Sequence, residues 1–199
     1  MKKDDLEALR KEMEEATLPL MRSNLVFGEG DPGSKVLFIG EAPGRDEDIQ
    51  KRPFVGRAGQ LLNKLISEIG WKREDVYITN IVKRRPPDNR DPLPEEIDAY
   101  QPYLTRQINI IDPVIIVPLG RFAMNYFLPN AKITRDQGTI FEKGDRLIYP
   151  VFHPAAALRG TGVMNEFRAS MHKLPDLLSK TPTLEPEPVE DEVTQTSLF

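Results

Sequence analysis

A short segment that follows an apolar run carries residue types suited to ligand binding and acid–base chemistry. The apolar run covers residues 35–39, and the segment GEAPG follows it at residues 40–44. Small residues such as Gly40 and Ala42 let backbone N–H groups approach a ligand, while Glu41 places a carboxylate beside them. Glu47 is a second candidate carboxylate in the acidic stretch that follows. A tight turn bordered by surface acids is the alternative interpretation of this segment.

Asn80 stands near the end of a β-branched segment at residues 76–82 and carries a carboxamide, which accepts and donates hydrogen bonds at once. A fixed carboxamide matches uracil, which offers N3–H and O4, whereas cytosine offers an unprotonated N3 and an amino group. An asparagine that caps a turn is the competing interpretation. Asn80 is therefore a candidate for reading a planar ligand.

His153 and Phe54 could complete such a site. His153 follows an apolar segment at residues 147–152, and it could donate a hydrogen bond to the oxygen of a leaving group. Phe54 lies in a loop shortly after residues 40–44, where its ring could stack on a flat heterocycle. A lone histidine is usually structural and a phenylalanine is more often a core anchor, so both roles depend on convergence of these segments.

Basic residues gather in the loop that follows residues 76–82, in the segment KRRPPDNR. A cluster of this kind can contact the phosphates of a nucleic acid, although a solvated run of surface charge is the ordinary alternative. Beyond His153, two residues are candidates to wedge into DNA and to brace it. The candidate DNA-binding residues are Lys83, Arg84, Arg85, Arg90, Leu158 and Arg159.

Segments typical of strands alternate with segments whose apolar residues recur at helical spacing. We expect strands over residues 35–39, 76–82, 114–119 and 147–152, helices over 59–69, 94–111, 121–128 and 163–178, and a hairpin around 143–145. This order predicts an α/β fold, a three-layer α/β/α sandwich with a central, mainly parallel four-stranded sheet. Ligands of such sheets bind at the carboxyl ends of the strands, so Glu41, Asn80 and His153 should lie close together.

Charge is distributed unevenly along the 199 residues, whose formal net charge is −4. Residues 181–199 hold five of the 31 acids and no base, which leaves 27 bases against 26 acids in residues 1–180. We expect an amphipathic N-terminal helix over residues 1–17 that packs on the body, a catalytic domain over residues 18–180, and a disordered acidic tail over residues 181–199.

Composition excludes several kinds of site. The chain has no cysteine, which excludes disulfides, thiolate-held metal clusters and a cysteine nucleophile, and its two histidines make a histidine-rich metal site unexpected. We therefore expect no metal. The chain has no apolar stretch of about 18 residues and no export-signal pattern at its start. We expect a cytoplasmic protein without a membrane partner.

Taken in order, five motifs resemble those of the family-four uracil-DNA glycosylases. They are GEAPG at 40–44, PFVGRAG at 53–59, YITNIVK at 77–83, RPP at 85–87 and HP at 153–154. The resemblance spans about residues 18–178. It implies a three-layer α/β fold, a uracil flipped out of DNA into a pocket, and hydrolysis of its N-glycosidic bond to leave an abasic site. Flipping is required because the scissile bond is shielded within the base stack.

With this resemblance, each candidate residue takes a role. Phe54 should stack on uracil, Asn80 should read N3–H and O4, and His153 should donate to O2 as charge develops. Backbone N–H groups of residues 40–44 should contact the uracil oxygens.

A carboxylate should orient or deprotonate the water, with Glu41 as first choice and Glu47 as second. Glu47 could instead crowd the uracil C5 position and reject the methyl group of thymine. The sequence does not decide between the two carboxylates.

The chain departs from the family in one respect. The family normally holds an iron–sulfur cluster on four cysteines, and the aligned positions here carry Glu15, Leu18, Arg84 and Tyr100. We therefore expect no cofactor. An apolar contact between Leu18 and Tyr100, with an ion pair between Glu15 and Arg84, is the expected structural substitute.

The segment QTSLF at residues 195–199 resembles the short bacterial sliding-clamp-binding motif. In that motif the glutamine and the Leu-Phe pair occupy a clamp pocket, which assigns this role to Gln195, Leu198 and Phe199. We expect uracil-containing DNA as substrate, a sliding clamp as a further partner, and a monomer that associates with the nucleoid when it is on DNA.

Two other functions fit the same fold. A non-catalytic DNA- or sliding-clamp-binding protein could have kept the fold after losing the cluster, but the candidate site residues all remain, which argues against decay: Glu41, Phe54, Asn80 and His153. A related glycosylase for another deaminated base, such as hypoxanthine, or a mismatch enzyme that acts on thymine, is the second alternative, and Asn80 favours uracil.

Overall fold

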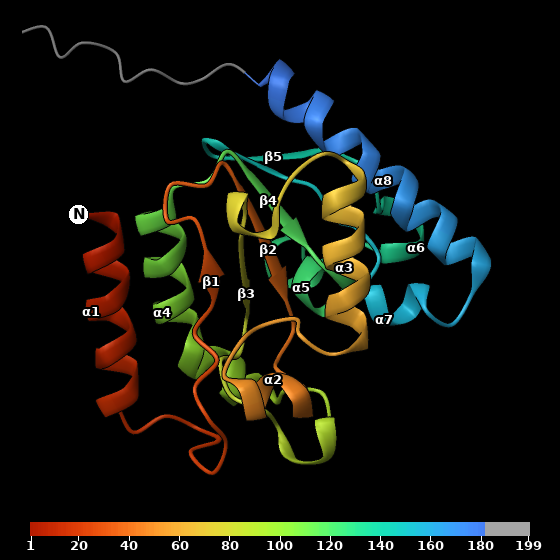
Figure 1. Ribbon diagram of the computed structural model, residues 1–199. Helices are drawn as coiled ribbons and strands as arrows, with labels where there is room; N and C mark the ends of the chain where they lie inside the picture. The colour runs from red at the N-terminus through yellow and green to blue at the C-terminus, as the bar shows by residue number, and fades with distance from the viewer. Residues whose placement is uncertain (182–199) are drawn as a thin grey trace, which may run out of the picture.

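The computed structural model describes residues 1–181, and its centre is a six-stranded sheet (Figure 1). The strands are β1 (Glu29–Gly30), β2 (Val36–Gly40), β3 (Tyr77–Asn80), β4 (Ile115–Pro118), β5 (Phe141–Lys143) and β6 (Arg146–Ile148), in the spatial order β1-β3-β2-β4-β6-β5. The inner four strands β3, β2, β4 and β6 pair in parallel, as the sequence predicts. Two short antiparallel edge strands, β1 and β5, extend the predicted four-stranded sheet.

The helices occupy both faces of the sheet. They are α1 (Lys2–Glu15), α2 (Arg45–Gln50), α3 (Arg57–Glu68), α4 (Pro94–Ile111), α5 (Gly120–Phe127), α6 (Ile133–Asp136), α7 (Pro154–Ala157) and α8 (Thr161–Lys180), with short 3-10 helices η1 (Arg73–Asp75) and η2 (Pro87–Asn89). Figure 1 shows α1 and α4 on one side of the sheet and α3 and α8 on the other. The α/β fold and its three layers are confirmed.

Alternation along β2 explains the two cores. Val36 and Phe38 point into a cluster with α3 and α8, whereas Leu37 and Ile39 point into a cluster with α1 and α4. Successive side chains of a strand face opposite sides of the sheet, so an entirely apolar strand requires a helical layer on each side. All five residues of β2 are buried.

Helix α1 packs on the body through one apolar face. Leu6, Leu9 and Met13 are buried, and Arg106 of α4 donates to both carboxylate oxygens of Glu12. The three apolar residues recur at steps of three and four, which places them on the same side of a helix. The expected acidic tail falls almost entirely on residues 182–199, which lie outside the described residues.

The strand expected over residues 147–152 is shorter in the structure. Strand β6 ends at Ile148, and the chain continues beside β4 through a single parallel bridge between Leu119 and Val151. Pro118 of β4 interrupts the ladder because it has no N–H to donate, although the N–H groups of Tyr149 and Val151 still donate to the Ile116 and Pro118 carbonyls. This continuation carries the chain to His153 at the same edge as the ends of β2 and β3. Within residues 1–181, none of the helices is long and apolar enough to cross a membrane.

Candidate active site

A pocket of about 680 Å³ lies at the carboxyl ends of the parallel strands. Its walls come from the loops after β2, β3 and β4 and from the segment that begins at His153. This is the edge where parallel sheets bind ligands, since the loops after the strands converge there. The predicted residues that line it are Glu41, Ala42, Glu47, Phe54, Asn80, Arg90, His153 and Arg159.

Gly40 and Asn80 are direct neighbours in the pairing of β2 with β3. A Cβ atom on Gly40 would lie 2.3 Å from Asn80 Oδ1 and 2.5 Å from Phe54 Cζ. Position 40 therefore has no room for a side chain, and only glycine fits there. The prediction that its own N–H contacts uracil stays a prediction.

The Asn80 side chain is buried, with only 2% of the residue exposed, and it lines the pocket. Its Oδ1 has no hydrogen-bond partner among the described residues. Buried polar atoms in folded proteins are almost always bonded, and leaving one unbonded costs stability. A buried acceptor without a partner, on a residue that lines a pocket, is a candidate for an atom that a ligand completes.

Phe54 adopts a left-handed backbone conformation, with φ of +50°, which is uncommon for a bulky side chain. A Cβ atom on Gly59 would lie 2.0 Å from the Phe54 carbonyl carbon, so the first turn of α3 packs directly on this backbone. The Phe54 ring lies 5.9 Å from the His153 ring, with an angle of 37° between the planes. Both rings thus line one side of the pocket.

His153 is the N-cap of α7, and its Nδ1 accepts a hydrogen bond of 3.1 Å from the Ala155 N–H. Burial lowers the pKa of His153 to about 4, with Glu47 acting in the opposite direction and Arg159 in the same direction. The neutral imidazole that results carries its hydrogen on Nε2, because Nδ1 is an acceptor. His153 can therefore donate from Nε2 at neutral pH.

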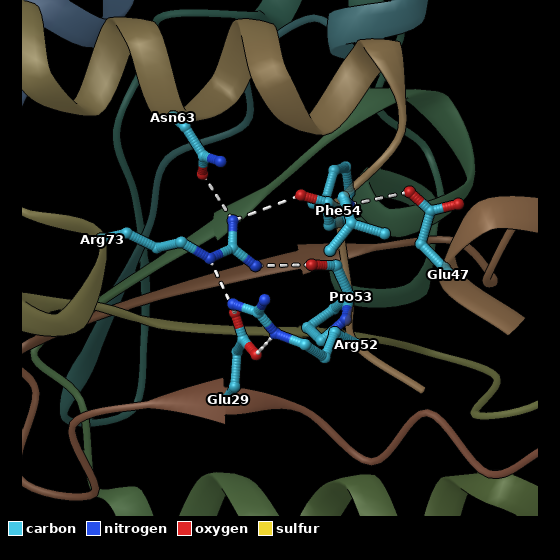
Figure 2. Close-up of polar contacts among 8 residues, drawn as sticks. Glu29, Glu47, Arg52, Pro53, Phe54, Asn63 and Arg73 are labelled. Carbon is cyan, nitrogen blue, oxygen red and sulfur yellow. Dashed lines mark hydrogen bonds and ion pairs between the residues drawn. The ribbon is translucent and has the colours of Figure 1, made fainter. Parts of the chain in front are cut away.

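Glu41 and Glu47 occupy different electrostatic environments. Burial raises the pKa of Glu41 to about 7, Asp91 adds to the rise, and Arg121 opposes it. Glu47 Oε1 instead accepts hydrogen bonds from the N–H groups of Val55 and Gly56, at 2.9 and 2.8 Å. Figure 2 shows Glu47 beside the loop that carries Phe54. Glu41 is thus poised for proton transfer near neutral pH, and Glu47 holds a loop.

Lys83 and Arg84 are buried, which contradicts the prediction that these two residues contact DNA phosphates. Lys83 has no exposed surface, and its Nζ donates to Thr79 Oγ1, the Asn80 carbonyl and Gln107 Oε1 at 2.6–2.7 Å. Burial lowers the pKa of Lys83. Arg84 is 7% exposed and donates to the Ser23 carbonyl.

Other predicted DNA-binding residues lie at the surface. Arg85 donates to Asn89 Oδ1, and Arg90 forms a two-bond ion pair with Glu96. Leu158 is 42% exposed, and the exposed Arg159 lines the pocket. Leu158 and Arg159 are thus exposed where a partner could reach them, which is compatible with the predicted wedge and brace.

Arg121 and Phe122 also line the pocket, and neither was among the residues predicted from the sequence. The Arg121 guanidinium lies 4.2 Å from the centre of the Phe122 ring, within the range of a cation–π contact. Both residues lie at the start of α5, directly after β4. Ligands bind at the carboxyl ends of parallel strands, and the strand expected over residues 114–119 ends just before Arg121 and Phe122. The sequence therefore holds a signal that points to these two residues.

The four positions aligned with the cluster cysteines are Glu15, Leu18, Arg84 and Tyr100, and they do not fit an iron–sulfur cluster. Such clusters are held by thiolates, whereas these positions offer a carboxylate, an alkyl group, a guanidinium and a phenol. Within residues 1–181, Glu15 is exposed and forms no ion pair with Arg84, so that part of the expected substitute is wrong.

The remaining contacts near these positions hold distant segments together. The Tyr100 hydroxyl donates to the Pro19 carbonyl at 2.7 Å, and burial raises the pKa of Tyr100 while the nearby Arg84 opposes the rise. Leu18 packs against the apolar cluster that contains Tyr100. Arg84 donates to the Ser23 carbonyl, and the Ser23 hydroxyl donates to the Arg85 carbonyl, so these bonds join the segment after α1 to the loop after β3.

Comparison with known proteins agrees with this geometry. Residues 27–174 match the model of the uracil DNA glycosylase superfamily. Curated relatives include type-4 uracil-DNA glycosylases from Thermotoga maritima, 47% identical over 76% of this chain and 79% of the relative, and from Saccharolobus solfataricus, 46% identical over 81% and 79%. A type-4 uracil-DNA glycosylase from Archaeoglobus fulgidus is 43% identical over 82% of this chain and 87% of its own length.

Proposed function

The chain belongs to the uracil-DNA glycosylase superfamily, and from this premise we propose that it removes uracil from DNA by hydrolysing the N-glycosidic bond. The product is an abasic site. The observation that carries this proposal is that Asn80, a residue that lines the pocket, has a buried Oδ1 without a partner among the described residues. This atom can accept the hydrogen of uracil N3, and the amide nitrogen of the same side chain can donate to O4.

Phe54 would provide the stacking surface for the extruded base. Its ring lines the pocket next to His153, and aromatic rings hold flipped bases by stacking. Extrusion is needed because a pocket at a sheet edge cannot reach a glycosidic bond inside a duplex. The strained backbone of Phe54 supports this role, since strain of this kind gathers at functional sites.

His153 would stabilise the departing base. The bond between N1 and the sugar breaks with negative charge on uracil, which a hydrogen bond to O2 offsets. A neutral imidazole that donates from Nε2 suits this role, because its Nδ1 is already bonded to the Ala155 N–H. The low pKa of His153 keeps the ring neutral across the physiological range.

Glu41 would handle the water, and Glu47 would hold the loop that carries Phe54. A carboxylate with a pKa near 7 exchanges protons readily at neutral pH, and its anion offsets the cationic character of the sugar. The hydrogen bonds from Val55 and Gly56 occupy one oxygen of Glu47. This difference supports Glu41 as the general base.

DNA would approach across the exposed rim of the pocket. Arg159 supplies positive charge there, and Leu158 could enter the gap left by the extruded base. Arg85 and Arg90 lie nearby on the loop after β3 and could contact the phosphates. We further propose a monomer that uses Gln195, Leu198 and Phe199 to bind a sliding clamp; these three residues lie outside the described part of the chain.

We also propose that the chain functions without the iron–sulfur cluster of the family. The absence of cysteine and the bond from Tyr100 to Pro19 support this. An iron assay and an ultraviolet–visible spectrum of anaerobically purified protein test it. Bound iron with absorbance near 400 nm would contradict the proposal.

A cleavage assay tests the proposed activity. A labelled oligonucleotide with one uracil, and matched strands with thymine, cytosine or hypoxanthine, are incubated with the protein without added metal and then cleaved with alkali at abasic sites. We expect cleavage at uracil alone, and its loss in Asn80→Ala and His153→Ala. Folded protein that cleaves none of these strands would favour a non-catalytic binding protein, and cleavage at hypoxanthine alone would favour the other glycosylase.

A further inference from the structure

Arg73 lies behind the loop that carries Phe54 and makes four hydrogen bonds there (Figure 2). Its Nε donates to Glu29 Oε1 at 2.7 Å, and its Nη1 donates to Asn63 Oδ1 and, at 3.3 Å, to the Phe54 carbonyl. Its Nη2 donates to the Pro53 carbonyl. One guanidinium thus connects the edge strand β1, helix α3, η1 and the loop.

The loop is held from two opposite sides. Figure 2 shows Arg73 on one side of Pro53 and Phe54 and Glu47 on the other. The cation binds two successive carbonyls of the loop, while the Glu47 carboxylate binds the next two N–H groups. The positive guanidinium contacts carbonyl oxygens, and the negative carboxylate contacts N–H groups. Both interactions are therefore favourable, and both fix the same stretch of backbone.

The Phe54 backbone needs such support. A left-handed conformation at a bulky residue persists only where its surroundings leave no easier alternative. Gly59 packs against one side of this backbone, but a steric contact does not prevent the peptide on either side from rotating away. Hydrogen bonds to the Pro53 and Phe54 carbonyls oppose that rotation directly.

We propose that Arg73 is a positioning residue for uracil excision, which acts by fixing the backbone that presents the Phe54 ring to the base. The inference rests on the stacking role proposed for Phe54. Arg73 is not among the described residues that line the pocket. It therefore acts through the loop and not on the substrate. The Arg73 side chain is 17% exposed, and Glu29 aligns it from β1.

Arg52 provides a matched control. It binds the same carboxylate, Glu29, at 2.7 and 3.0 Å, but its side chain is 55% exposed, and among the described contacts it donates to neither loop carbonyl. Loss of Arg52 therefore removes an ion pair from Glu29 without touching the carbonyls of Pro53 and Phe54. A surface ion pair of this kind contributes little.

The experiment is a double-mutant cycle of Arg73→Ala and Phe54→Ala, measured as single-turnover excision from a single-uracil oligonucleotide with enzyme in excess. In the wild-type background we expect Arg73→Ala to slow excision about a hundredfold at saturating enzyme, since small displacements of a positioned group have effects of this size. Affinity for DNA should change little. In the Phe54→Ala background the further loss should be about twofold, because both changes remove the same function.

Arg52→Ala should stay within about twofold of wild type. Arg73→Lys should show an intermediate rate, because an ammonium cannot bond two carbonyls and Asn63 in the planar arrangement that a guanidinium allows. Circular dichroism at the assay temperature establishes which variants are folded. If Arg73→Ala is unfolded, Arg73→Lys replaces it in the cycle.

The outcomes separate the two proposals. Equal losses from Arg73→Ala in both backgrounds would overturn the positioning role, because Arg73 would then act independently of Phe54. A Phe54→Ala enzyme as fast as wild type would overturn the stacking role, and the inference about Arg73 with it. Full activity of Arg73→Ala beside an impaired Phe54→Ala would overturn the inference alone.

Discussion

Two buried polar groups on the segment that leaves β3 are only three residues apart, and the protein treats them in opposite ways. Lys83 is fully buried and its Nζ donates three hydrogen bonds, to Thr79, Asn80 and Gln107. The side-chain oxygen of Asn80 is also buried, yet it has no partner among the described residues. Burial alone therefore does not distinguish Lys83 from Asn80, whereas the bonding of their polar atoms does.

The same contrast separates the pocket from the layer behind it. In the pocket, the pKa of Glu41 is raised to about 7 and that of His153 is lowered to about 4, chiefly because both are buried. Behind the pocket, Arg84 is bonded to Ser23 and the Tyr100 hydroxyl to Pro19. We infer that the substrate completes the pocket groups, while the protein itself completes the Tyr100 hydroxyl and Arg84 Nη1; the Arg84 Nε has no partner among the described residues.

The largest effect should come from Asn80→Ala. We expect a loss of about a hundred- to a thousandfold in the rate of excision, typical of removing one group that binds the developing charge. The free energy of unfolding should be nearly unchanged, because the variant removes an oxygen that has no partner among the described residues. Single-turnover kinetics and denaturant titration measure the two quantities, and an equally large loss of stability would show that Asn80 is structural.

The second prediction concerns pH. Because a general base acts in its deprotonated form, the excision rate should rise with pH through about 7, the pKa of Glu41, and level off above it. Two pH units below the pKa, about one per cent of the carboxylate remains ionised, so the rate should fall about a hundredfold. Glu41→Gln should be slow and independent of pH over this range.

Asp91→Asn sharpens the test of Glu41. Removing a neighbouring negative charge that raises the pKa of Glu41 should move the midpoint of the pH profile to lower pH. Glu47→Gln should leave the midpoint near its wild-type value. A profile that follows Glu47 and not Glu41 would reverse the proposed assignment of the two carboxylates.

Lys83→Met should act mainly on stability. It leaves acceptors of Thr79, Asn80 and Gln107 without their donor, and a buried unsatisfied group costs about 1–3 kcal/mol. Denaturant titration measures this loss. The folded variant should excise uracil at a rate much closer to wild type than Asn80→Ala does, and the opposite ranking would remove the distinction between the two groups.

The smallest effect should come from Arg159→Ala, which removes an exposed charge at the rim. We expect weaker DNA binding that is similar for all sequences, and a slope of log affinity against log salt that falls by about 1. Fluorescence anisotropy over a series of salt concentrations measures the slope. Lys83→Met, whose charge lies inside the protein, should leave the slope unchanged.

Much of the fold and the centre of the site could be predicted from the sequence. Apolar runs and helical spacing are local properties, and they predict the four parallel strands and α3, α4, α5 and α8. Once the sheet is parallel, the carboxyl ends of its strands lie at one edge. The convergence of Glu41, Asn80 and His153 follows from that geometry, and the pocket contains all three.

The rest depended on partners that are distant in the chain. The sequence shows Lys83, Arg84 and Arg85 as one basic run, but α4 places Gln107 over Lys83 and the N-terminal segment places Ser23 over Arg84, so only Arg85 reaches the surface. The two-residue strand β1 is too short to show any periodicity.

Sequence alone therefore determined which elements form and which strand ends meet, because periodicity is repeated over many neighbouring residues. Only the tertiary structure decided which polar groups are satisfied, because each hydrogen bond depends on a single pair of atoms. Arg73 illustrates this: its partners Glu29, Pro53, Phe54 and Asn63 come from separate parts of the chain. No local pattern specifies such a set, since it exists only after the sheet and α3 have packed together.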